Sequence, residues 1–339
     1  MIRLVCTVVM GLALAAGCGG KGGKVMAGKA GEVIAAQTSS VAAVTVPSFD
    51  ADSAFSYVKA QTDFGPRVPN TAAHKACAQW LADKLRGFGA ETIVQDIEVT
   101  AFDGTLIKGF NIIGQYKPEL RKRVIICSHW DSRPWADNDP DKANRKTPVD
   151  AANDGASGVA VILEIARQMQ MLQPEIGVDC IFLDAEDWGP GSDWKGSERA
   201  EMWGLGTQYW ARRMHRQDYN ARFAILLDMV GGQDAVFYRE AYSVHYAPAV
   251  VDKVWNAAAV TGNGRLFSNE VSGYVTDDHV FINTIAKIPA VDIIPYYPDC
   301  RQSSFGPTWH TVSDNLEHID RATLQAVGQT VMYVIYNEK

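Results

Sequence analysis

Four short apolar runs most constrain how this chain can fold. They are Arg123–Ser128, Val178–Leu183, Phe223–Leu227 and Ala290–Ile294. The core of the first run is Val124-Ile125-Ile126-Cys127, which would present apolar side chains on both faces of a strand. Such strands are typical of the centre of a parallel sheet that is covered by helices on both sides. The runs therefore predict central strands of a buried sheet.

Helical patterns alternate with these runs. Apolar residues recur at helical spacing in Ala72–Gly87, Gly155–Met171 and Asp320–Tyr336, and two further strand-like segments are Thr92–Val99 and Phe110–Tyr116. This alternation predicts an α/β protein with three α/β/α layers around a mostly parallel mixed sheet. Because no repeat and no second boundary is visible, we expect residues 47–339 to form a single domain.

The first residues are typical of an export signal. In residues 1–17 a positive charge precedes an apolar stretch that is too short to span a bilayer. The sequence then reads Ala15-Ala16-Gly17-Cys18, which resembles a bacterial lipobox with Cys18 as the lipid site. Cleavage by an ordinary signal peptidase is the alternative, because a lipobox usually has leucine where Ala15 stands. We expect an exported lipoprotein that faces the periplasm or the cell surface, with residues 18–46 as a flexible tether.

Composition excludes some classes of function. The net charge of −7 argues against a nucleic-acid partner, whose phosphates require a basic surface. Contact with a membrane is expected only through the lipid anchor, and a monomer is the favoured oligomeric state. Four cysteines lie beyond the tether, at Cys77, Cys127, Cys180 and Cys300, and no CxxC pair indicates a structural zinc site. Their disulfide pairing stays open.

Acidic and histidine side chains gather where the predicted strands end. The clusters are His129-Trp130-Asp131, Asn153-Asp154-Gly155, Asp184-Ala185-Glu186-Asp187, Asp228 and Trp309-His310-Thr311. Parallel strands bring their carboxyl ends to one edge of the sheet, where ligands bind. Carboxylate and imidazole ligands without thiolate suit a catalytic zinc, which takes three protein ligands and keeps one open position. Singly, each carboxylate would more often be a helix cap or a solvated charge; together they predict a metal site.

Local spacing suggests a division of roles. His129 and Asp131 are two apart on an extended segment, so Asp131 can orient His129. Adjacent side chains diverge at Glu186 and Asp187, so one can bind metal while the other faces substrate and moves protons.

The order of these motifs resembles a known superfamily, the zinc aminopeptidase-like (zinc-exopeptidase-like) proteins, from about Phe64 to the C-terminus. Within it the chain resembles the animal-type glutaminyl-peptide cyclotransferases, which also occur in bacteria. The features that are specific to the cyclotransferases are Trp309 directly before His310, the run Asp277-Asp278-His279, and Phe305. The NDGASG and HxD motifs occur in the aminopeptidases of this superfamily as well as in the cyclotransferases, so they support only the fold.

The resemblance implies roles for individual residues. Zinc, one ion per chain, would be bound by Asp154, Asp187 and His310. Glu186 would be the catalytic acid and base, Asp277 would contact the transition state, and Asp228 would be its acidic neighbour. The pocket walls would be Trp309, Phe305 and one of Trp188, Trp194 and Trp203, of which we favour Trp194.

Three features depart from the animal pattern. Glu186-Asp187 replaces a Glu-Glu pair, Thr276 stands where glutamine is expected, and residues 138–148 resemble a surface insertion near the mouth of the site. Aspartate is still an ordinary zinc ligand.

The implied reaction converts the N-terminal glutamine of peptides or proteins to pyroglutamate and releases ammonia. The first alternative is a two-zinc aminopeptidase, because its five ligands are matched by His129, Asp154, Asp187, Asp228 and His310. The second is a non-catalytic surface-binding domain, which predicts a broken ligand set.

Overall fold

The structure is a computed structural model that describes residues 44–339, which form one compact unit. The predicted signal segment 1–17, the lipid site Cys18 and most of the tether lie outside the described residues. Within residues 44–339, the helices are all too short or too polar to cross a membrane.

A six-stranded mixed sheet forms the centre of the molecule, in the order β1-β2-β4-β3-β5-β8. The strands are β1 (Glu91–Thr100), β2 (Leu106–Tyr116), β3 (Arg123–His129), β4 (Gly177–Leu183), β5 (Ala224–Leu227) and β8 (Ala290–Ile293). Strands β4, β3, β5 and β8 run parallel, whereas the hairpin β1–β2 joins the edge of β4 antiparallel. The predicted mostly parallel mixed sheet is confirmed. A separate pair, β6 (Phe237–Arg239) and β7 (Phe267–Val271), lies outside it.

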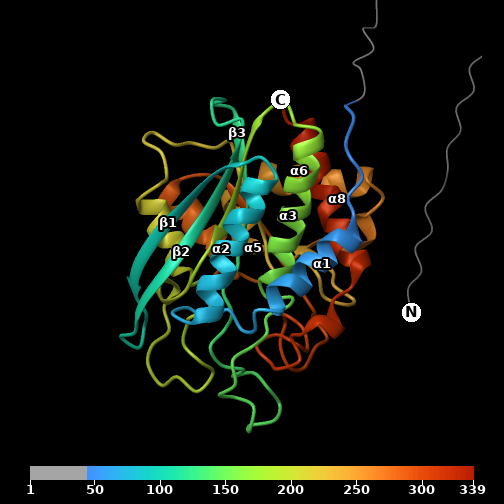
Figure 1. The fold of residues 1–339 in the computed structure, drawn as a ribbon. Coiled ribbons are helices and arrows are strands. Elements are labelled where there is room, and N and C mark those ends of the chain that lie inside the picture. The colour runs from blue at the N-terminus through green and yellow to red at the C-terminus, as the bar shows by residue number, and fades with distance from the viewer. Residues whose placement is uncertain (1–43) are drawn as a thin grey trace, which may run out of the picture. The chain divides into compact units, whose positions relative to one another are not determined.

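Helices cover both faces of the sheet (Figure 1). They are α1 (Ala51–Thr62), α2 (Ala72–Gly87), α3 (Ala156–Met171), α4 (Leu205–Arg212), α5 (Ala241–Tyr246), α6 (Pro248–Val260), α7 (Asp278–Phe281) and α8 (Arg321–Asn337). One face carries α3 with α1, α2, α6 and α8 around it, and the other carries α4 and α7.

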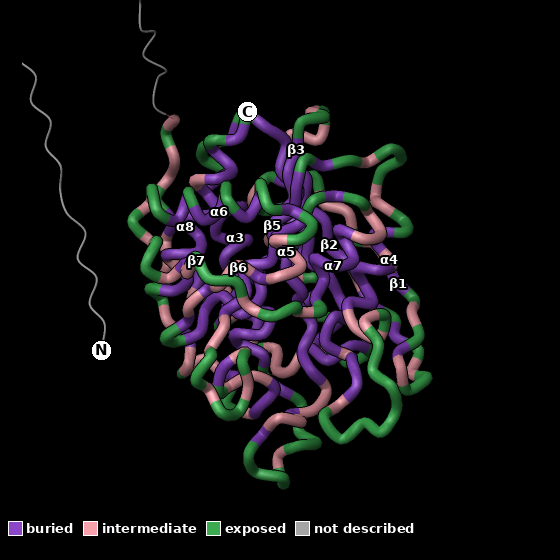
Figure 2. Tube along the Cα trace, turned by 180° about the vertical axis from the view of Figure 1, so that it is seen from behind, coloured by how far each residue is buried: buried purple, intermediate pink, exposed green. Residues whose placement is uncertain are grey.

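Alternate residues of the central strands supply two separate cores. In β3, Val124 and Ile126 belong to the core under α3, whereas Ile125 and Cys127 belong to the core beside α4. The strand is buried throughout (Figure 2). Burial on both faces is the reason why the strand sequence shows no polar alternation, and it confirms the three-layer fold.

Two glycines of the NDGASG motif let α3 begin against the ends of the strands. A Cβ on Gly155 would lie 2.3 Å from the carbonyl oxygen of His129, and one on Gly158 would lie 2.2 Å from that of Leu227. The close approach places Asp154 directly over the carboxyl ends of β3 and β5.

Replacing Gly158 by alanine should lower the free energy of unfolding by about 1–3 kcal/mol, because the new methyl group must displace backbone in a closely packed region. Urea denaturation of the metal-free protein measures the change. Gly87→Ala is the matched control, since a Cβ there meets no atom within 4 Å. Equal stability of the two variants would contradict this account of the motif.

Candidate metal centre

The structure brings the predicted polar clusters together at one edge of the sheet. His129 ends β3, Glu186 follows β4, Asp228 follows β5, and Asp154 directly precedes the residue that caps α3. His310 reaches the same place from the loop before α8. All of these side chains are buried.

Asp154, Asp187 and His310 form a compact group whose ligand atoms lie within 4.8 Å of one another. His310 Nε2 is 3.2 Å from Asp187 Oδ1 and 3.7 Å from Asp154 Oδ2. Asp187 Oδ2 is buried and has no hydrogen-bond partner within residues 44–339. Two carboxylates and an imidazole that converge in this way fit a zinc ion with a vacant position.

His129, Asp154 and Asp228 form a second group that shares Asp154 with the first. His129 Nε2 lies 2.9 Å from Asp154 Oδ1 and 3.2 Å from Asp228 Oδ1. Burial lowers the pKa of His129, but the surrounding carboxylates outweigh it and hold this pKa well above its usual range. A protonated His129 can therefore balance both carboxylates, although the same atoms also suit a second metal.

Backbone hydrogen bonds fix the acidic residues in place. Asp131 accepts the N–H groups of Glu186 and Asp187 at 3.1 and 3.2 Å, and its carboxylate also lies 3.5 Å from His129 Nδ1. Asp314 accepts the N–H of Asp154 at 3.1 Å. Asp131 therefore orients Glu186 and Asp187 as well as His129, the only partner that the sequence spacing predicted. The role of Asp314 was not predicted.

Arg133 and Asp137 are further residues that the sequence did not reveal. The buried Arg133 guanidinium donates to Asp187 Oδ1 at 3.2 Å and to Asp137 Oδ1 at 2.8 Å. Asp137 Oδ1 lies 3.4 Å from His310 Nδ1. Burial raises the pKa of Asp137, but the bonds from His310 and Arg133 outweigh it and the net shift is downward. Asp137 is therefore the carboxylate that holds the imidazole of His310.

We expect Asp137→Ala to weaken metal binding by about 10- to 100-fold, because His310 would lose the acceptor that fixes its ring. Competition with a chromophoric chelator measures the affinity. Asp193→Ala serves as control, since its exposed carboxylate lies on a neighbouring loop. Unchanged affinity in Asp137→Ala would show that the contact does not support the ligand.

A cavity of about 270 Å³ opens beside the ligand group. Trp309 stacks on His310 with ring centroids 3.7 Å apart, and Phe305 lies 5.0 Å from Trp309. Trp203, not Trp194, completes this wall, and its ring is nearly parallel to that of His310 with the centroids 6.5 Å apart. The preference for Trp194 thus disagrees with the structure: the residue is 42% exposed, and its ring packs edge-on against Phe102.

Glu186, Asp277 and Asp228 face the same cavity. Burial, together with the charges of Asp187 and Asp277, raises the pKa of Glu186 well above its usual range, although His129 opposes the shift. Burial and the charge of Asp154 raise the pKa of Asp228 to about 8. The site therefore combines a metal-ligand group with a carboxyl group suited to hold and release a proton.

With this fold and this site, the chain belongs to peptidase family M28, whose model matches residues 111–335. Within that family it is similar to glutaminyl cyclases. The structure of Bacteroides thetaiotaomicron glutaminyl cyclase bound to N-acetylhistamine is 57% identical, with a TM-score of 0.85 over 87% of this chain and 100% of that one. A structure described as a leucine aminopeptidase precursor from the same species is 56% identical, with a TM-score of 0.85 over 88% of this chain and 100% of that one.

The glutaminyl-peptide cyclotransferase of Drosophila melanogaster is 24% identical over 291 residues, which cover 76% of this chain and 73% of the relative. The resemblance to this group of enzymes is confirmed. The M28 fold and the buried aspartate and histidine groups together indicate zinc.

Proposed function

We propose that this protein is a glutaminyl-peptide cyclotransferase, which converts N-terminal glutamine to pyroglutamate and releases ammonia. The main support is that Glu186 faces the same small cavity as the group Asp154, Asp187 and His310. A volume of about 270 Å³ suits a single amino-acid side chain with its backbone amine. The similar glutaminyl cyclases support the same reaction.

One zinc ion per chain would be held by Asp154, Asp187 and His310. When bound, zinc supplies a Lewis acid that polarises the side-chain amide carbonyl of the substrate.

Glu186 is the proton-transfer group in this proposal. Its carboxylate accepts a proton from the α-amino nitrogen, which attacks the side-chain carbonyl carbon and closes the lactam ring. The same carboxyl then gives a proton to the departing amide nitrogen, so one ammonia leaves for each ring formed. A raised pKa suits a group that must both accept and donate. Asp277, whose buried Oδ2 has no partner within residues 44–339, is placed to accept a hydrogen bond from the substrate amine.

The aromatic walls would hold glutamine in a bent shape. Trp309, Phe305 and Trp203 are rigid and largely apolar, and they line the cavity beside the ligand group. If the amine is already held against the carbonyl carbon, less freedom is lost and less solvent must be rearranged during the attack. In well-aligned model reactions this pre-ordering lowers the activation barrier by up to about 7–11 kcal/mol. The same walls exclude water, which would otherwise compete with the amine.

A two-zinc aminopeptidase is the second candidate, because His129, Asp154 and Asp228 could hold another ion. One observation favours one ion: His129 Nε2 already lies within hydrogen-bond distance of the carboxylates of both Asp154 and Asp228. A non-catalytic binding domain is the least supported alternative, since every ligand position carries a competent side chain.

The test is a zinc-loaded sample incubated with a glutamine-initiated dipeptide, with ammonia as the readout. Release should stop on chelation and return when zinc is restored, with about one zinc per folded chain. Two zinc ions per chain together with cleavage of leucine anilide would support the aminopeptidase instead.

We also propose the remaining assignments of the sequence: a signal in 1–17, acylation at Cys18, a tether over 18–46 and a single catalytic domain over 47–339. The protein would be an exported bacterial lipoprotein and a monomer, with peptides or proteins bearing N-terminal glutamine as substrates. Labelling with a radioactive fatty acid should be lost in Cys18→Ala; retained labelling would reject the anchor.

A further inference from the structure

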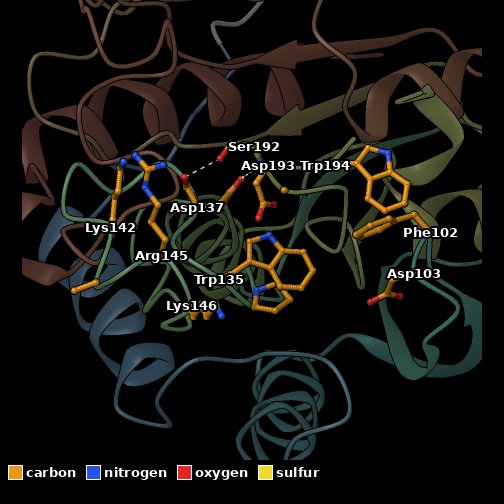
Figure 3. A pocket seen from close by; sticks show the side chains of 13 residues that line it. Phe102, Asp103, Trp135, Asp137, Lys142, Arg145, Lys146, Ser192, Asp193 and Trp194 are labelled. Atoms are coloured by element: carbon orange, nitrogen blue, oxygen red, sulfur yellow. Dashed lines mark hydrogen bonds between the residues drawn. The ribbon is translucent and has the colours of Figure 1, made fainter. Parts of the chain in front are cut away.

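A second cavity, of about 540 Å³, is lined in part by Asp137, the residue that contacts His310. Figure 3 shows the side chains that line this cavity. Aromatic side chains line one part of it: Phe102, Trp135 and Trp194. Basic side chains line another part: Lys142, Arg145 and Lys146. The basic residues belong to the segment 138–148 that the sequence marked as an insertion.

The two cavities are separated by a wall in which the Arg133 side chain lies against the rings of Trp135 and Trp203. The guanidinium carbon of Arg133 lies 5.3 Å from the Trp135 ring centroid and 5.1 Å from that of Trp203. Trp135 lines the second cavity and Trp203 the first. Asp137 also lines the second cavity while it contacts His310. Both cavities are therefore built at the same edge of the sheet, by the loops that hold the metal ligands.

A peptide bound at its N-terminal residue must leave the first cavity, which has room for little more than one residue. The next three or four residues, if extended, span about 10–14 Å. The two ring centroids lie 5.3 and 5.1 Å from the guanidinium carbon of Arg133, so this reach is enough to pass over the wall and enter the second cavity.

The lining of the second cavity suits a particular segment. The aromatic rings of Phe102, Trp135 and Trp194 offer apolar walls against which an aromatic side chain can pack. Acidic residues also line the cavity, but Asp137 is paired with Arg133. Asp103 and Asp193 then remain against three basic side chains, which favours an anionic ligand group.

We propose that this second cavity is a subsite for the substrate segment downstream of the N-terminal glutamine, and that it prefers an aromatic residue followed by a carboxylate. The inference rests on the proposed cyclotransferase function and specifies its substrates. The carboxylate can come from an acidic side chain or from a peptide C-terminus.

The preference is measured with three substrates of the full enzyme: Gln-Ala, Gln-Ala-Ala-Phe-Glu-amide and Gln-Ala-Ala-Phe-Lys-amide. Replacing the amide of the acidic peptide by a free C-terminus separates the two sources of carboxylate. We expect a KM about five- to tenfold lower for the acidic peptide than for the basic one, since several partly exposed charge contacts add small gains. Equal KM values for the two pentapeptides would overturn the proposal.

The decisive variant is the double substitution Lys142→Glu with Lys146→Glu. Arg145 is kept because its Nε donates to the backbone oxygen of Asp139 at 2.8 Å and so holds the loop. The variant should lose the preference for the acidic peptide while Gln-Ala is turned over as before. The matched control, Lys75→Glu with Lys122→Glu, changes the net charge equally at residues that line neither cavity. A preference that persists in the first variant, or disappears equally in the control, would overturn the proposal.

A binding measurement separates this proposal from the function on which it rests. Acetyl-Ala-Ala-Phe-Glu-amide has no N-terminal glutamine to react, and calorimetry should detect its binding to the wild type and a weaker binding to the double-charge variant. Equal affinity of both proteins would refute the subsite. A failure to cyclise Gln-Ala would instead refute the proposed function.

Discussion

Replacing Glu186 by glutamine should lower kcat for cyclisation by about 10²- to 10⁴-fold, because a neutral amide cannot accept the proton of the attacking amine. Glu186 is buried in the cavity but is not in the ligand group, so the zinc content should stay the same. Ammonia release under saturating substrate measures kcat, and elemental analysis measures zinc.

Glu198→Gln is the matched control for this variant. Glu198 lines the same cavity, but it is exposed and accepts a hydrogen bond from Trp203 Nε1 at 2.9 Å. We expect less than a tenfold change in kcat there, since only the position of an aromatic wall is affected. Similar losses in both variants, or loss of zinc in Glu186→Gln, would show that Glu186 does not have the role we give it.

Replacing Arg133 by methionine should destabilise the metal-free protein by about 3–5 kcal/mol, because the buried Asp187 and the largely buried Asp137 would lose the guanidinium that contacts both. The guanidinium lies between Asp187 and Asp137, and its side chain is only 1% exposed. Urea denaturation in the presence of a chelator measures the change. Metal binding should also weaken in Arg133→Met, since Arg133 holds the ligand Asp187 and also Asp137, which in turn holds the ligand His310.

Arg265→Met provides the comparison for this prediction. Arg265 is exposed, so we expect a change of about 0.5 kcal/mol or less. If Arg133→Met unfolds at the same urea concentration as Arg265→Met, the buried ion pairs do not stabilise the fold as described.

The strands were predictable because a strand that is buried on both faces consists almost entirely of apolar residues. Each of the four apolar runs overlaps an observed strand, and the helix predicted over Ala72–Gly87 has those bounds in the structure. Helices α1 and α4 were missed, because only short parts of them are apolar and their stability comes from contacts with the rest of the fold. Helix α6 could have been found, since Pro248 at its start precedes apolar residues at helical spacing.

The ligand group was predictable because Asp187 follows a strand, Asp154 precedes a helix, and His310 directly follows Trp309 in a recognisable loop motif. The supporting residues were not, since Arg133, Asp137 and Asp314 acquire their roles from partners that are distant in sequence or in an irregular loop. The choice between Trp194 and Trp203 failed for the same reason: neither has a spacing signal, and the loop conformation decides which ring faces His310.

Mass spectrometry of a glutamine-initiated dipeptide after incubation with the zinc-loaded protein tests the central claim most directly. The account predicts an intact peptide bond and a product that has lost one ammonia, formed about 10²- to 10⁴-fold more slowly by Glu186→Gln. Free glutamine together with the second amino acid would contradict it and would identify the site as that of a peptidase.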